Sequence, residues 1–161
     1  MHNEAYEAPG GEIIVRKYRS SDWESIRDIH DAARMEELRL AGLAEAFLPL
    51  EVAAEREGLF DYEIFVAELN GEPAGFAACS EDELAWLYVH PRFFRRGVGR
   101  RLAEEVLAHT GRPVWAEVLA GNAPAAALYR RLGFAEKEVC TGHMPGNEKF
   151  VVTVSRLCLE K

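Results

Sequence analysis

The segment from Leu84 to Arg101 constrains this chain most, because it joins an apolar strand to a helix through a glycine turn. The apolar run ends at His90 and Pro91, and the Gly-Val-Gly sequence at residues 97–99 opens the helix. Glycine lets the backbone approach a ligand closely, and the first N–H groups of a helix have no partner inside it. A strand-to-helix turn of this kind predicts an anion-binding site.

The charges around this turn point the same way. The helix macrodipole leaves roughly half a positive charge at a helix N-terminus, which favours acidic neighbours there. This turn has basic neighbours instead, and we therefore expect a polyanionic ligand to compensate them. The four basic residues are Arg95, Arg96, Arg100 and Arg101.

The composition is typical of one globular domain. The chain has 161 residues, of which 48% are hydrophobic and 29% charged, and this length is sufficient to bury about two thirds of the unfolded surface. A net charge of −8 argues against nucleic-acid binding and against binding to anionic membranes, both of which need a basic face. We expect residues 1–11 to be a flexible tail, neither signal peptide nor membrane span, and residues 12–161 to form the single domain.

The cysteines favour a cytoplasmic protein. Cys79, Cys140 and Cys158 are an odd number, lie far apart, and do not have the spacing of metal ligands. Reduced thiols are the expected state, with neither a disulfide framework nor a metal site.

Hydrophobic periodicity and turn residues predict alternating strands and helices. We expect an α/β (α+β) fold in which a mixed central sheet carries helices on both faces. The last helix, opened by Asn122 and Pro124, is expected to bury Ala127, Leu128 and Leu132, and residues 142–147 are expected to form a loop. The predicted strands are 13–18, 62–69, 73–80, 84–89, 114–119, 134–141 and 150–159, and the predicted helices start near residues 23, 50, 99 and 123.

Two motifs, LYVHPRFFRRGVGRRL and EVLAGNAPAAALYRRLGF, resemble those of the Gcn5-related N-acetyltransferases. The resemblance implies a sheet splayed between its fourth and fifth strands, with acetyl-coenzyme A in the gap and its pyrophosphate on the glycine turn. The family pattern is Arg/Gln-x-x-Gly-x-Gly/Ala, and Phe94 replaces its first residue, so one side-chain contact to phosphate is expected to be lost. The coenzyme-binding residues implied are Leu87, Tyr88, Val89, Phe94, Arg95, Arg96, Gly97, Val98, Gly99, Arg100, Asn122, Ala125 and Tyr129.

The resemblance also implies a direct transfer of the acetyl group from the thioester to a primary amine. A backbone N–H near Val89 would stabilise the thioester oxygen. Tyr129 would act as general acid toward the leaving thiolate, a proton transfer that is uphill by roughly 2 kcal/mol in water. Glu117, five residues before Asn122, would accept the amine proton, with Glu83 acting through water, or water alone, as the alternatives.

Several readings remain open at this stage. The acceptor is a peptide N-terminus, a lysine or a small-molecule amine, selected by residues 20–58 and 142–147. The domain is alternatively a non-catalytic sensor of acyl-coenzyme A, or an interaction module whose turn binds nothing. Exposed apolar residues at a sheet edge leave a homodimer open. Leu102, where a dinucleotide-binding motif needs glycine, disfavours that class of site.

Overall fold

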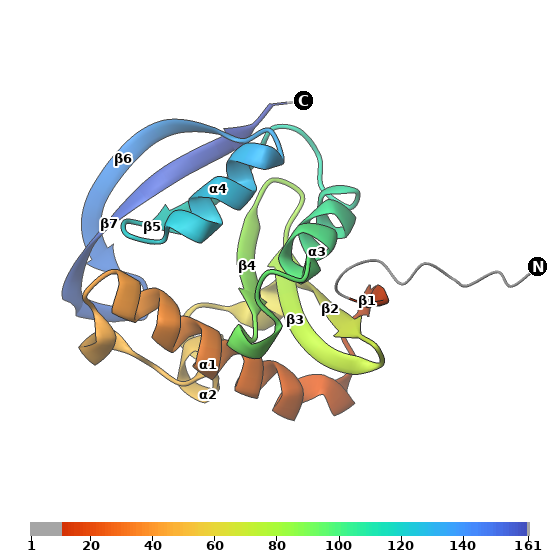
Figure 1. Ribbon diagram of the computed structural model, residues 1–161. Coiled ribbons are helices and arrows are strands. Elements are labelled where there is room, and N and C mark those ends of the chain that lie inside the picture. Colours follow the sequence, from red (N-terminus) through yellow and green to blue (C-terminus); the bar gives the residue numbers. More distant parts are fainter. Residues whose placement is uncertain (1–10, 161) are drawn as a thin grey trace, which may run out of the picture.

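The computed structural model describes residues 11–160, and the predicted tail at residues 1–11 lies outside this range except for Gly11. The described chain alternates strands and helices as the periodicity predicts (Figure 1). In chain order the elements are β1 (Ile13–Lys17), α1 (Trp23–Leu40), α2 (Leu50–Arg56), β2 (Glu63–Leu69), β3 (Glu72–Cys79), β4 (Leu84–Val89), α3 (Val98–Leu107), β5 (Val114–Leu119), α4 (Ala123–Arg131), β6 (Ala135–Met144) and β7 (Asn147–Leu159).

Within residues 11–160 the strands form two antiparallel sheets, ordered β1-β2-β3-β4 and β5-β7-β6. A parallel bridge between Glu83 and Trp115 joins them where β4 and β5 begin, and the Trp115 N–H donates to the Asp82 carbonyl at 2.8 Å. Beyond this bridge the two strands separate, as Figure 1 shows. The predicted splay between the fourth and fifth strands is therefore confirmed, and it opens a gap in the middle of the molecule.

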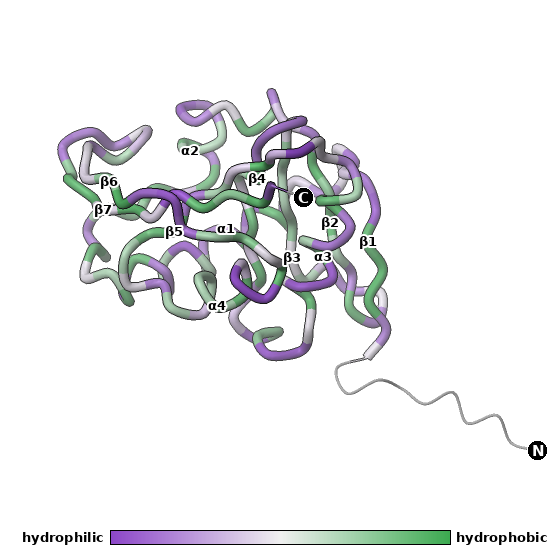
Figure 2. The backbone as a smooth tube through the Cα atoms, turned by 90° about the horizontal axis from the view of Figure 1, so that it is seen from above, coloured by the Kyte–Doolittle hydropathy of each residue, from purple (hydrophilic) through white to green (hydrophobic). Residues whose placement is uncertain are grey.

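Each face of the first sheet has its own hydrophobic core. Successive side chains of a strand point to opposite faces, and here both faces are covered by helices. One face packs on α1 and α2, and the other on α3. In Figure 2 apolar segments follow the strands, while hydrophilic ones gather in turns and at exposed edges. Toward α1 and α2 point Ile64, Val66, Phe76 and Ala78; toward α3 point Phe65, Ala67, Leu69, Ala77 and Cys79.

The predicted loop at residues 142–147 is wrong. Strand β6 continues to Met144 and β7 begins at Asn147, so Pro145 and Gly146 alone form a tight hairpin turn. Gly146 has φ of +77°, a conformation that glycine adopts more readily than residues with a side chain. Met144 is buried at the end of β6, and the hairpin brings it back toward α1.

The predicted inner face of α4 also needs correction. Ala127, Leu128 and Leu132 are only half-buried, and Tyr129 is the buried residue of the helix. The Tyr129 ring packs edge-on against Phe134, with 5.2 Å between ring centroids. Helix α4 packs on one face of the second sheet. The buried face of this helix is narrow and centred on Tyr129.

The structure also bears on membranes, metals and self-association. Among residues 11–160, every helix is too short or too polar to cross a bilayer. The same residues contain no group of three or more side chains arranged to hold a metal ion. Strand β6 is an outer edge of its sheet and exposes Val139, so the homodimer stays a prediction.

Candidate active site

The glycine turn presents free backbone donors. Gly97 has φ of +83° and precedes the first residue of α3. The Arg101 N–H donates to the Gly97 carbonyl at 3.0 Å, which closes the first helical turn. Within the described chain, the N–H groups of Val98, Gly99 and Arg100 find no acceptor, as expected for a helix N-terminus. These three donors point to the place where the sequence predicts a pyrophosphate.

The arginines around this turn are not equivalent. Arg100 pairs with Glu104 at 2.9 Å and Arg101 with Glu105 at 3.2 Å, so α3 neutralises both itself. Arg95 and Arg96 are exposed and have no carboxylate partner among residues 11–160. Phe94 beside them is 49% exposed. The positive charge left for an anion therefore comes from Arg95 and Arg96.

The edge of β4 adds further donors along the gap. The His90 N–H donates to the Ala74 carbonyl at 2.9 Å, and Val89 lies opposite Gly75. Because hydrogen-bonded and non-hydrogen-bonded pairs alternate in an antiparallel ladder, Val89 and Gly75 form a non-hydrogen-bonded pair. The N–H and C=O of Val89 therefore point away from β3. Leu87, two residues earlier, has the same orientation. Both N–H groups therefore face the gap, at the level where the sequence places the thioester.

Tyr129 lies buried near this gap. Burial raises the pKa of its phenol above the ordinary value, and the Glu37 carboxylate raises it further. A phenol in these surroundings keeps its proton at every working pH. Tyr129 therefore has the protonation state that a general acid needs.

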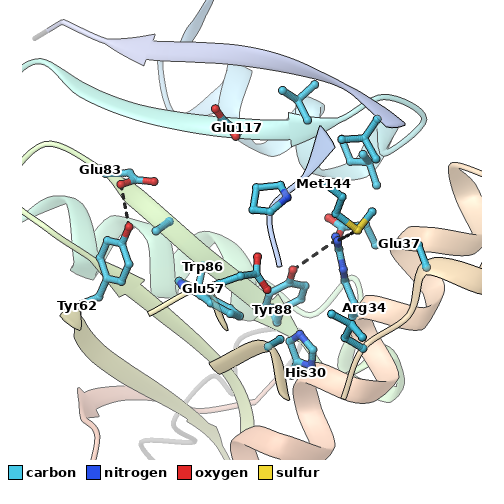
Figure 3. A pocket seen from close by; sticks show the side chains of 18 residues that line it. His30, Arg34, Glu37, Glu57, Tyr62, Glu83, Trp86, Tyr88, Glu117 and Met144 are labelled. Atoms are coloured by element: carbon cyan, nitrogen blue, oxygen red, sulfur yellow. Dashed lines mark hydrogen bonds and ion pairs between the residues drawn. The ribbon is translucent and has the colours of Figure 1, made fainter. Parts of the chain in front are cut away.

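A cavity of about 360 Å³ opens on the opposite side of the gap from α3 (Figure 3). Helices α1 and α2, strands β4 and β5, and the β6–β7 hairpin form its walls. Aromatic rings of Tyr62, Trp86 and Tyr88 line it together with charged groups. The acidic and basic residues that line it are His30, Arg34, Glu37, Glu57, Glu83 and Glu117.

Glu37 is the most connected of these carboxylates. It accepts hydrogen bonds from Asn122 Nδ2 at 3.0 Å and from the Tyr88 hydroxyl at 3.4 Å, and it forms an ion pair with Arg34. Asn122 also accepts the Ala125 N–H at 3.3 Å, so its side chain caps α4. The Tyr88 backbone pairs with Phe76; its ring faces the cavity, away from the glycine turn.

The two predicted candidates for the base lie at the mouth of the cavity. Glu117 is 56% exposed and lies 3.7 Å from Arg156 Nε. Glu83 accepts a hydrogen bond from the Tyr62 hydroxyl at 3.0 Å. In Figure 3 both carboxylates lie at the upper part of the cavity, where β4 and β5 separate. Each can exchange protons with solvent there.

Three charged residues of the cavity, Arg34, Glu37 and Glu57, lie within residues 20–58, the segment expected to select the acceptor, but sequence reasoning gave none of them an individual role. One signal was present. Ile26, Ile29 and Ala33 mark the inner face of α1, and Glu37, four residues after Ala33, continues that face. A carboxylate at the next position of an apolar helix face indicates a buried polar partner. No comparable pattern singles out Glu57, which ends α2.

The comparisons with known proteins agree with this geometry. A family model described as the acetyltransferase (GNAT) family matches residues 23–134. An uncharacterized N-acetyltransferase of Methanocaldococcus jannaschii is 36% identical over 94 residues, and the match covers 48% of this chain and 41% of the relative. The [ribosomal protein bS18]-alanine N-acetyltransferase of Escherichia coli K12 is 36% identical over 84 residues, 47% of this chain and 57% of the relative. The chain thus spans about half the length of the curated relatives it matches.

Solved structures show the same fold. A GCN5-related N-acetyltransferase from Rhodopseudomonas palustris superposes with a TM-score of 0.75 at 22% identity, covering 92% of this chain and 95% of that one. The yncA protein of Salmonella typhimurium, solved with its cofactor acetyl-CoA, gives a TM-score of 0.65 at 19% identity, covering 92% and 93%. At these identities the likeness shows the fold, and the predicted fold class is confirmed.

Proposed function

This chain belongs to the acetyltransferase (GNAT) family, and from that premise we propose that it transfers the acetyl group of acetyl-coenzyme A directly to a primary amine. The family match confirms the membership that the two sequence motifs predicted. The family uses acetyl-coenzyme A, and one structural neighbour was solved with it.

The observation that carries the proposal is the gap between β4 and β5, which has complementary chemistry on its two sides. Toward α3 lie free N–H groups of the glycine turn, of Leu87 and of Val89, with Arg95 and Arg96 nearby. They fit a long, polyanionic thioester coenzyme, since helix N-termini bind phosphate and free strand edges bind amides. Toward α1 and α2 lies a separate cavity for the amine.

Each residue then has one task. Acetyl-coenzyme A, when bound, supplies an activated acyl group. The Val89 N–H would hold the carbonyl oxygen, where negative charge develops. Tyr129 gives its proton to the departing sulfur and regains one from the amine nitrogen. Glu117, through solvent at the cavity mouth, takes the proton that the ammonium loses before attack.

The acceptor is proposed as a primary amine entering through the carboxylate-lined cavity. The name of the E. coli relative, a ribosomal-protein alanine N-acetyltransferase, supports a peptide N-terminus as the first to test. An α-amine of pKa about 7.9 needs only about 1.2 kcal/mol to lose its proton at pH 7, whereas lysine needs roughly 4.6 kcal/mol. The three free cysteines support the cytoplasm as its location.

The test is release of coenzyme A thiol from acetyl-coenzyme A in the presence of an alanine-starting peptide, an Nα-blocked lysine and spermidine. We expect turnover with at least one amine. In parallel, coenzyme A at 100 times its Kd should add about 2.7 kcal/mol of stability, a rise in Tm of roughly 5–10 °C. A thermal shift without turnover would favour the sensor. The absence of both a thermal shift and turnover would contradict both coenzyme-dependent functions.

The role of Glu117 has its own test. Replacing Glu117 by Gln should move the acidic limb of kcat/KM toward higher pH and lower the rate at pH 7 by about tenfold or more. Glu138 is a matched control, since it contacts the same Arg156 from β6 and lies outside the cavity. A pH profile identical to wild type would remove Glu117 from the role.

A further inference from the structure

The geometry points to Glu37 as a positioning residue: through Asn122 it fixes the start of α4 and thereby the place of the Tyr129 phenol. This inference rests on the proposed function, because it concerns how the general acid of that reaction is held. It goes beyond the family motifs, since Glu37 lies on α1, far from both of them in sequence.

The direct link is one hydrogen bond across 85 positions of the chain. Asn122 Nδ2 donates to Glu37 Oε2 at 3.0 Å, while Asn122 Oδ1 accepts the Ala125 N–H at 3.3 Å. One amide side chain therefore caps α4 with its oxygen and ties that helix to α1 with its nitrogen.

A second, independent contact holds the same two ends together. Gly121, next to Asn122, has φ of +98°, and a Cβ there would lie 2.8 Å from the Leu40 carbonyl oxygen. The backbone of the β5–α4 turn thus packs directly on the C-terminal end of α1. This close backbone contact opposes movement of the start of α4 toward α1, and the hydrogen bond from Asn122 to Glu37 opposes its movement away.

Glu37 is itself held from several directions. Its side chain is 18% exposed and ion-paired with Arg34, and its Oε1 accepts the Tyr88 hydroxyl at 3.4 Å. Arg34 contacts Met144 Sδ at 3.7 Å, so the hairpin also supports the pair. The carboxylate is therefore fixed relative to β4, whose edge faces the thioester site.

The position of Tyr129 in α4 makes it sensitive to this contact. Tyr129 follows Asn122 by seven residues, which places both on the same face of the helix, two turns apart. A rigid helix transmits a shift at its first turn to the phenol. A displacement of about 1 Å at reacting groups is enough to cost on the order of 100-fold in rate.

The test exchanges the hydrogen-bond donor and acceptor between positions 122 and 37. Asn122→Asp keeps the cap for Ala125 but sets a carboxylate against Glu37. At pH 8, with acetyl-coenzyme A and the best amine of the panel above, we expect kcat to fall at least tenfold while the KM for acetyl-coenzyme A changes less than threefold. In the double variant Glu37→Gln/Asn122→Asp, the Gln amide donates to Asp, and kcat should recover at least fivefold over the Asn122→Asp variant.

Glu36→Gln is the matched control, because Glu36 is exposed on the same helix and pairs with Arg39 at 2.8 Å; its introduction into Asn122→Asp should give no recovery. Recovery of Tm without recovery of kcat would reduce Glu37 to a structural residue and overturn the inference. If the wild type acetylates no amine, the proposed function fails by itself. Thermal unfolding then decides whether the exchanged pair forms, and a double variant no more stable than Asn122→Asp overturns the inference.

Discussion

Tyr129 is a buried phenol, and burial determines its strength as an acid. Its pKa lies above the usual value of about 10, so the group is always protonated but releases its proton less readily than in water. The transfer stays feasible because the same dry surroundings raise the pKa of the thiol. The proposed role therefore requires that donor and acceptor of this proton share one desolvated gap.

Replacing Tyr129 by Phe should lower kcat by roughly 100-fold, in the range of general acid catalysis, and change the Kd of coenzyme A less than threefold. Single-turnover acetylation and calorimetric titration measure the two quantities. An unchanged kcat would exclude Tyr129 as the acid. A large loss of coenzyme affinity would instead identify it as a binding residue.

Glu57 is a carboxylate whose pKa is raised into the neutral range. Burial raises its pKa from 4.5 to about 7, with Arg34 opposing and Glu37 and Glu148 adding to the shift. Because the folded state holds this proton more tightly than the unfolded state, stability is highest below about pH 4.5 for this group and falls as the pH rises to about 7.

Glu57→Gln should remove that loss and make the protein more stable above pH 7 by roughly 1–3 kcal/mol. Urea unfolding at pH 5 and pH 8 measures the difference, and Glu55→Gln on the exposed side of α2 is the control. Equal pH dependence in the wild type and the Glu57 variant would contradict the shifted pKa.

At the scale of elements, the turn between β5 and α4 packs closely on the backbone at the end of α1. Gly121→Ala should destabilise the fold by about 2 kcal/mol or more, since it adds a clash with Leu40 to the cost of a left-handed backbone. Gly42→Ala is the control: Gly42 also has positive φ, +72°, but nothing lies within 4 Å of a Cβ there. Chemical denaturation should give Gly121→Ala a much lower free energy of unfolding than Gly42→Ala. Equal losses of unfolding free energy in the two variants would rule out the clash.

The elements themselves were largely predictable because their signals are local. Strands β4 and β5 begin and end where the apolar runs do, and Asn70 and Gly71 both adopt the positive φ that an Asn-Gly hairpin needs. The connection between β6 and β7 was expected, but its turn is shorter than predicted, because residues 142–144 pair with the opposite strand. The prediction of which residues of α4 are buried was wrong, because helical periodicity does not specify which face of a helix meets a sheet.

The parts of the candidate site that lie in short sequence motifs could be predicted. The parts that form through tertiary contacts could not. The glycine turn is a local signal within one segment, whereas Tyr129 was singled out only by the resemblance of its motif to those of a known family. Glu37 and Glu57 become cavity residues only because α1, α2 and the hairpin meet, and contacts between segments over a hundred residues apart, such as Arg34 with Met144, leave little trace in one sequence.

At the scale of the whole molecule, a net charge of −8 opposes the approach of a polyanionic coenzyme, and Arg95 and Arg96 offset this locally. The double variant Arg95→Gln/Arg96→Gln should raise the Kd of coenzyme A by about tenfold at 50 mM salt, and by less at 500 mM, where charges are screened within about 4 Å. Arg101→Gln is the control, because Glu105 already pairs with Arg101. Equal affinity of wild type and double variant at low salt would contradict this role.

The separation of β4 from β5 gives the gap two different sides. Free backbone donors of β4 and α3 lie on one side, whereas the cavity on the other side is bordered by α1, α2 and the β6–β7 hairpin. Under the proposed function, the coenzyme and the amine would approach the gap from different sides, and neither would have to leave before the other. Substitutions that line the cavity should then change the choice of amine while leaving the affinity for the coenzyme unchanged.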